Sequence, residues 1–168
     1  MTPRLPLLFA ILSLTLAGCA NYQLGTGGKL AFTTLYVAPA ENKSHLPQAQ
    51  AVVTTQIRAA LEQDGRVALA NSSQTAGATL EIVIRDYHRD VASVQEQDTG
   101  LARKFTLTLG AACTLRLRNG TVLFADRPVT AQRDAFTYGG QLQSEYQTLP
   151  LLAESLAKKI SHMVLDVW

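Results

Sequence analysis

The chain has 168 residues, of which 47% are hydrophobic, 17% charged and 7% aromatic, with a formal net charge of +2. This composition is typical of one globular domain and excludes a disordered or collagen-like chain. Because 15 basic side chains are set against 13 acidic ones, the charge also argues against a nucleic-acid or other bulk polyanion binder. Two cysteines exclude a disulfide-rich scaffold.

The first sixteen residues have the pattern of an export signal. Arg4 is followed by an uncharged, mostly apolar run over residues 5–16. A transmembrane helix needs about 20 apolar residues, so this run is too short to cross a bilayer. We therefore expect a signal peptide that is cleaved.

The sequence Leu16-Ala17-Gly18-Cys19 resembles a bacterial lipobox, in which signal peptidase II cuts before a lipid-modified cysteine. We predict a signal peptide over residues 1–18 and acylation of Cys19, with palmitate among the attached chains. Several acyl chains give a lasting membrane anchor, because each buried methylene contributes about 0.8 kcal/mol. The residue after Cys19 is alanine and not aspartate, and this pattern resembles that of lipoproteins that are forwarded to the outer membrane. Cys113 is then left without an intramolecular partner.

A glycine-rich polar segment separates the acylated residue from the folded part. We predict a tether over residues 19–29 and a single domain over residues 30–168. The domain begins with a predicted strand over residues 30–37, followed by a helix from Pro47 to the glycine stop at Gly65. A short strand is expected over residues 66–70.

Two long strands follow, and their alternating patterns are the clearest in the chain. Residues 79–94 begin with such alternation, and apolar residues occupy every second position from Phe105 to Leu117. One face of each strand is therefore buried. Asn119-Gly120 favours a two-residue type I′ turn, because both positions of that turn need positive φ.

This turn predicts a register in which Leu117 faces Val122 and Leu115 faces Phe124. The same register places Asp126 opposite Cys113 on the buried face, where an unpaired charge is costly. We therefore expect a bulge or a break near Asp126 to Pro128, and one extra residue there would return Val129 and Ala131 to the core.

The last element is a predicted helix with an apolar stripe from Leu149 to Val167. Thr148 is its expected N-cap, and Pro150 is expected in its first turn. The order of elements predicts an α+β fold, with two helices packed on one face of a mixed, mostly antiparallel sheet of four to five strands.

No catalytic constellation, cofactor motif or metal-ligand spacing emerges from the sequence, so we expect a non-enzymatic protein. Asp86, His88 and Asp90 lie on one side of a strand, but they lack the spacing of a metal motif and fit a strand that runs into solvent. The remaining candidates are surfaces.

The first candidate surface is a strip of small, uncharged residues on the uncovered sheet face. Long charged side chains usually protect such faces, so their absence predicts contact with another protein, although an inert solvated face accounts for the pattern equally well. The strip comprises Thr106, Thr108, Gly110, Ala112 and Thr114, with Arg85, Arg89, Arg116 and Arg118 expected at its flanks.

The second candidate is a cluster of cations near the tip of the long hairpin. Arg89 on one strand and Arg103 and Lys104 on the next are close enough in sequence to bind phosphates or carboxylates together. The alternative is a charged tip that only keeps the hairpin soluble.

Several segments together resemble the lipopolysaccharide-assembly lipoprotein family, LptE. The similarity lies in four segments, which follow the family's order and spacing: residues 19–25, residues 35–44, the long alternating strand with residues 119–123 after it, and residues 149–168. It covers nearly all of the chain after the predicted signal peptide.

The resemblance implies a non-enzymatic outer-membrane lipoprotein on the periplasmic side. Family members plug the lumen of the β-barrel lipopolysaccharide translocon, help it to assemble and bind lipopolysaccharide. By this function, and not by a matched motif, Arg89, Arg103 and Lys104 become candidate lipopolysaccharide contacts. The alternative function is an auxiliary lipoprotein of a periplasmic transport or secretion complex that does not bind glycolipid.

Overall fold

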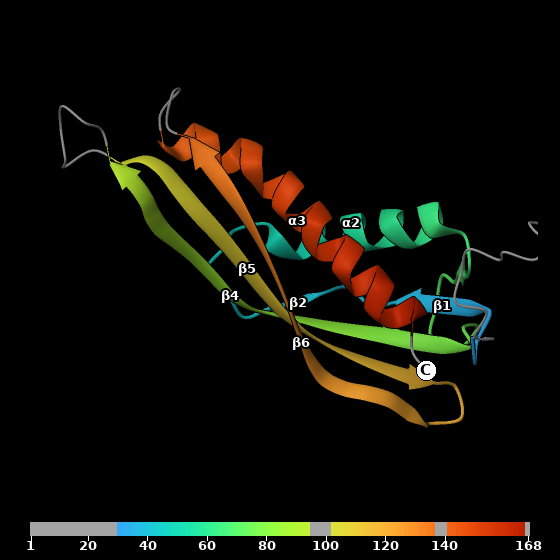
Figure 1. Cartoon of the computed structure of the whole chain (residues 1–168). Helices are drawn as coiled ribbons and strands as arrows, with labels where there is room; N and C mark the ends of the chain where they lie inside the picture. Colours follow the sequence, from blue (N-terminus) through green and yellow to red (C-terminus); the bar gives the residue numbers. More distant parts are fainter. Residues whose placement is uncertain (1–29, 95–101, 137–140, 167–168) are drawn as a thin grey trace, which may run out of the picture.

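The computed structural model describes residues 30–94, 102–136 and 141–166 (Figure 1). The elements in chain order are β1 (Thr34–Val37), β2 (Glu41–Asn42), α2 (Ala49–Asp64), β3 (Ala68–Leu69), β4 (Ala78–Val94), β5 (Ala102–Leu117), β6 (Val122–Phe136) and α3 (Gln141–Leu165). The strand order is β3-β1-β4-β5-β6, and β2 also pairs with β4.

The predicted α+β fold is confirmed, and the sheet is mixed. Strand β1 runs parallel to β3 and β4, whereas β4, β5 and β6 form antiparallel pairs. The sheet has six strands instead of the expected four to five. The difference comes from β2, whose two residues pair with Val83 and Ile84 and are too few to show any periodicity.

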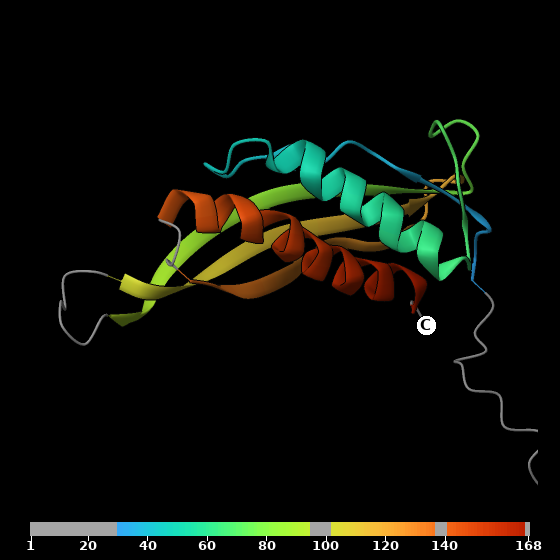
Figure 2. The same ribbon diagram turned by 90° about the horizontal axis from the view of Figure 1, so that it is seen from above.

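Both helices cover the same face of the sheet, and the other face is open (Figure 2). The core lies between these layers. Its largest fully buried side chains alternate along the strands and recur at helical spacing in α2 and α3: Leu35, Ile57, Leu61, Leu80, Ile84, Leu107, Leu109, Leu115, Leu152, Leu156 and Ile160. Within the described ranges, no helix is long and apolar enough to span a bilayer.

Helix α2 ends where the sequence predicts. Gly65 adopts a φ of 76°, and its N–H donates to the carbonyl of Leu61 at 3.2 Å. This left-handed conformation is strained for residues with a side chain, so glycine fits the C-terminal cap.

Helix α3 begins earlier than predicted, at Gln141, and Pro150 lies inside it. The expected N-cap at Thr148 is wrong. Its hydroxyl donates to the carbonyl of Ser144 at 2.7 Å, as hydroxyls within helices do. The sequence misplaced the start because Pro150 has the pattern of a first-turn proline, whereas the helix continues on its N-terminal side as far as Gln141.

The bulge predicted near Asp126 is present. Cys113 faces Arg127, and Asp126 takes a left-handed φ of 52°. The backbone N–H of Asp126 donates to the Thr114 hydroxyl at 3.0 Å. The extra residue returns Ala131 to the core, and Val129 packs against the core half-buried, as expected.

The turn between β5 and β6 differs from the type I′ prediction. The Gly120 N–H donates to the Leu117 carbonyl at 2.9 Å, and Gly120 has a φ of 89°, whereas Asn119 is not among the residues with positive φ. This is a longer turn that needs positive φ only at the glycine. Leu115 faces Phe124 as predicted, but the residue opposite Val122 is Arg116 and not Leu117.

A second bulge, in β4, was not predicted. Ile84 pairs with Ala111 and Asp86 pairs with Gly110, so Arg85 is an extra residue without a partner in the register. Because side chains alternate across a strand, one extra residue exchanges the two faces of everything that follows. Tyr87 and Arg89 consequently lie on the helix-covered face.

Candidate functional site

The two ends of the domain are formed by different segments of the chain. The chain enters the described structure at Leu30, at the same end as the last turn of α3, and the end of β4 and the start of β5 lie at the opposite end (Figures 1 and 2). The predicted signal peptide, the tether and Cys19 lie outside the described residues.

The strip of small residues lies along β5, the strand between β4 and β6. The alternation places its five members on the open face, where Gly110 and Ala112 are buried by their neighbours and the three threonines are half-buried. Two of the threonines are engaged within the sheet: Thr106 donates to Asp134 at 3.0 Å, and Thr114 accepts from the backbone of Asp126.

The flanks of the strip differ from the prediction. Among the four expected arginines, Arg89 lies on the helix-covered face, and Arg118 donates to the carbonyls of Ala76 and Thr75 at 2.8 and 2.6 Å. The neighbours of the strip on β4 and β6 instead include four carboxylates, Glu81, Asp86, Asp90 and Asp134. The open face is therefore an uncharged line with a mixed, largely acidic border.

An ion pair crosses the open face. Arg85, the bulge residue of β4, pairs with Asp126, the bulge residue of β6. These two strands lie on either side of β5, so the pair passes over β5 in the region of Ala112. A small residue at this position leaves room for the pair. The charge of Asp126, which the sequence analysis expected to be costly in the core, is turned outward and neutralised.

The predicted cation cluster is divided between the two faces of the sheet. Arg89 pairs with Glu145 of α3 and lies over the ring of Phe105, 5.4 Å from its centroid. Lys104 pairs with Asp134 at 2.8 Å on the open face. Arg103 belongs to β5, but its side chain is outside the described residues. The sequence analysis expected Arg89 beside the strip on the open face because it did not include the bulge at Arg85.

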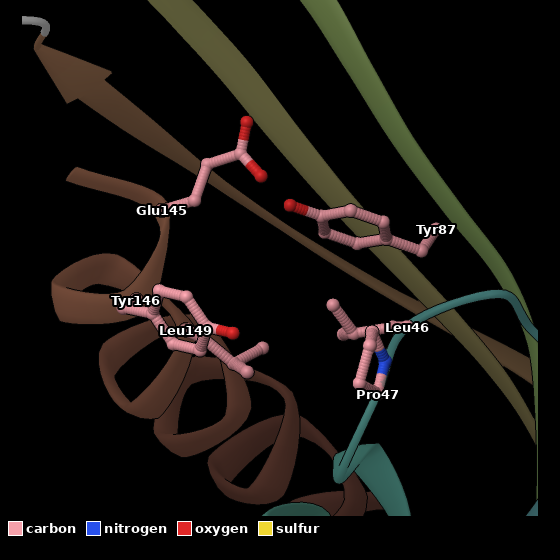
Figure 3. A pocket seen from close by; sticks show the side chains of 6 residues that line it. All are labelled: Leu46, Pro47, Tyr87, Glu145, Tyr146 and Leu149. Atoms are coloured by element: carbon pink, nitrogen blue, oxygen red, sulfur yellow. The ribbon is translucent and has the colours of Figure 1, made fainter. Parts of the chain in front are cut away.

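A small pocket on the helix-covered face had no signal in the sequence. Its volume is about 120 Å³, and Figure 3 shows that its lining comes from the loop before α2, from β4 and from the first turns of α3. The lining residues are Leu46, Pro47, Tyr87, Glu145, Tyr146 and Leu149. Predicting it would have required both the true start of α3 and the exchange of faces in β4.

The pocket has one polar end. The carboxylate of Glu145 and the hydroxyl of Tyr87 point toward one another (Figure 3). Burial, followed by the negative charge of Glu145, raises the pKa of Tyr87 above its ordinary value, so this phenol stays protonated at neutral pH. The pocket therefore combines apolar walls with a hydroxyl and an ion pair.

Cys113 is not part of any such site. It is fully buried on the covered face of β5, and burial raises the pKa of its thiol to about 12. Reactive thiols need a lowered pKa and exposure, so Cys113 is a core residue.

The structure places the chain among small α+β domains with one covered and one open sheet face. It is similar to a hypothetical protein, CT253, from Chlamydia trachomatis, with a TM-score of 0.59 and 9% identity over 82% of this chain and 98% of that one. A minor lipoprotein from Acinetobacter baumannii has a TM-score of 0.53 and 20% identity over 82% and 96% of the two chains. An uncharacterized lipoprotein B from Nitrosomonas europaea has a TM-score of 0.52 and 16% identity over 86% and 88%. These similarities show a shared fold.

The family model described as LptE, lipopolysaccharide-assembly, matches residues 32–163, and the chain belongs to this family. No curated protein sequence matches the chain. The family is a non-enzymatic lipoprotein family of the Gram-negative envelope, and membership assigns the chain a role in lipopolysaccharide assembly.

Proposed function

We propose that this protein is an outer-membrane lipoprotein, held on the periplasmic side by acylated Cys19, that plugs and helps to assemble the β-barrel lipopolysaccharide translocon. In this role it takes part in lipopolysaccharide insertion at the outer membrane. The observation that carries the proposal is the family match over residues 32–163, which spans the whole sheet and nearly all of α3.

The open sheet face supports contact with a barrel wall. It carries no helix, and its central line consists of glycine, alanine and threonine side chains that permit close approach. Its border of Asp86, Asp90 and Asp134 favours a partner surface with basic side chains at matching positions.

The cations support two separate contacts with lipopolysaccharide in place of one three-residue clamp. Arg89 and Lys104 lie on opposite faces, and each is already paired with a carboxylate. A phosphate group therefore has to displace Glu145 from Arg89 or Asp134 from Lys104. Arg103 is the third candidate by its position next to Lys104.

Purification of the native protein in mild detergent tests the proposal. A large outer-membrane β-barrel recovered with it supports the plug, whereas an ATPase-linked transporter supports the alternative of an auxiliary transport lipoprotein. Thr108→Arg, on the open face, is expected to reduce recovery of the barrel. Gln63→Arg, which adds the same charge to an exposed position of α2, is the matched control and should leave recovery unchanged.

Lipidation is tested by labelling with radioactive palmitate. The wild type and Cys113→Ser are expected to take up label, and Cys19→Ala is not. Equal labelling of Cys19→Ala would contradict the lipobox.

The glycolipid contacts are tested with purified lipopolysaccharide. Replacing Arg103 and Lys104 with glutamate is expected to weaken binding and to reduce its dependence on salt, because salt screens exposed charges. No change in either quantity would remove these residues from the proposal.

A further inference from the structure

The pocket exists because the two helices have different lengths. Helix α2 starts at Ala49, whereas α3 continues toward the distal ends of β4 and β5 as far as Gln141 (Figure 2). Past the start of α2, α3 covers this side of the sheet alone. The covered face of β4 at Tyr87 is left with a helix on one side and the loop of Leu46 and Pro47 on the other.

The size of the pocket limits what it can hold. A cavity of roughly 150 Å³ takes up a benzene molecule, so a volume of about 120 Å³ accommodates about five carbon atoms. This is a short segment of an aliphatic chain and not a whole fatty acyl chain. The walls, formed largely by Leu46, Pro47, Tyr146 and Leu149, suit such a segment.

The polar end of the pocket lies beside a guanidinium that is paired with a carboxylate. Glu145 both lines the pocket and binds the guanidinium of Arg89, so the position that its carboxylate occupies is adjacent to the cavity. A guanidinium binds phosphate in the same forked geometry as carboxylate. The side chain of Glu145 is 18% exposed and that of Arg89 is 43% exposed, so solvent reaches the pair.

We propose that the pocket and Arg89 form one binding site for a phosphorylated amphiphile. The phosphate takes the place of the Glu145 carboxylate on Arg89, and about five carbons next to the phosphate-bearing group enter the cavity between Tyr87 and Leu149. This inference rests on the proposed function, which it extends by naming the part of the glycolipid that is bound: the junction between a phosphate-bearing headgroup and its acyl chains.

Calorimetric titration of the full chain in nanodiscs tests the site, with empty nanodiscs as the blank. The probes are hexyl phosphate and inorganic phosphate. Burying an aliphatic segment of this length in the pocket is worth tenfold or more in affinity by the roughly 0.8 kcal/mol per methylene rule, so hexyl phosphate should bind at least about tenfold tighter. Equal affinity for the two probes would overturn the proposal.

Five variants, one of them a control, assign the parts of the site. Leu149→Trp fills the cavity and should remove the advantage of hexyl phosphate, whereas Leu151→Trp is the matched control on the same helix, because Leu151 is 44% exposed and does not line the pocket. Arg89→Gln should weaken both probes, and Glu145→Gln should strengthen both, because the phosphate then displaces a neutral group. If Leu149→Trp still binds hexyl phosphate as much more tightly than inorganic phosphate as the wild type does, the assignment of the cavity to the aliphatic segment is contradicted. Tyr146→Ala removes part of the exposed wall of the cavity instead of filling it, and it should likewise reduce the preference for hexyl phosphate over inorganic phosphate.

The same variants separate this inference from the proposed function. If wild type and Leu149→Trp bind lipopolysaccharide equally, the pocket assignment fails and the proposed function stands. If the wild type binds hexyl phosphate but neither lipopolysaccharide nor a barrel, the proposed function fails and the pocket remains. Short-chain phosphatidic acid, run beside lipid A, distinguishes a phospholipid source from a glycolipid source of the phosphate.

Discussion

Pro150 provides a direct test of how α3 is built. It lies well inside the helix, where proline has no N–H to donate to the carbonyl of Tyr146. An interior proline costs about 3 kcal/mol relative to alanine. Two effects reduce the gain from Pro150→Ala. Tyr146 is 61% exposed, so its surroundings are already open to water, and alanine adds freedom to the unfolded chain, worth about 0.4–1 kcal/mol.

We expect Pro150→Ala to raise the free energy of unfolding by about 2 kcal/mol. In urea, with a slope of about 2 kcal/mol per molar, this raises the midpoint followed by circular dichroism by about 1 M. Pro128→Ala is the matched control, because Pro128 lies in the edge strand β6 and not in a helix, and its effect should stay within about 0.5 kcal/mol. A lowered or unchanged midpoint in Pro150→Ala would refute a helix that continues through position 150.

Three further predictions concern single residues. Iodoacetamide at pH 8 should leave Cys113 unmodified in the folded protein and modify it after unfolding, as measured by mass spectrometry; labelling of the folded chain would contradict its burial. Asp126→Val should lower stability by about 1–2 kcal/mol in chemical denaturation, because a β-branched residue is strained at positive φ, and Asp126→Asn should cost less. The pKa of Asp64 is held below its ordinary value chiefly by the hydrogen bond from Arg66, so its stabilising contribution is present above about pH 4 and is lost as the pH falls through the lowered pKa. Arg66→Ala should therefore flatten the decrease in Tm between pH 5 and 3, and an unaltered slope would argue against the pair.

The parts of the fold that depend on alternation or on a local conformational requirement were predictable. The buried face of β5 follows from its apolar residues at every second position, and the bulge at Asp126 follows from the cost of burying a charge opposite Cys113. Gly65 ends α2 because the cap needs positive φ.

The parts that depend on tertiary contacts were not predictable. The bulge at Arg85 leaves no mark in the alternation, since Tyr87 and Arg89 are acceptable on either face, and the ion pair with Asp126 appears only once β4, β5 and β6 are aligned. The pair between Glu145, near the start of α3, and Arg89 likewise appears only in the folded chain. The candidate cations were therefore correctly placed along the hairpin but assigned to the wrong face in the case of Arg89.

The length of the hairpin sets a spatial scale for lipopolysaccharide assembly. The 16 residues of β5 extend for about 50 Å at roughly 3.4 Å per residue, more than the hydrocarbon thickness of a bilayer, about 30 Å. In the proposed arrangement, Arg89 lies opposite Leu107, ten residues or roughly 34 Å along β5 from Leu117 at the end where the chain enters the domain. The sheet then fixes the distance between the end of the domain nearest the membrane anchor and the site at Arg89 where a glycolipid is held.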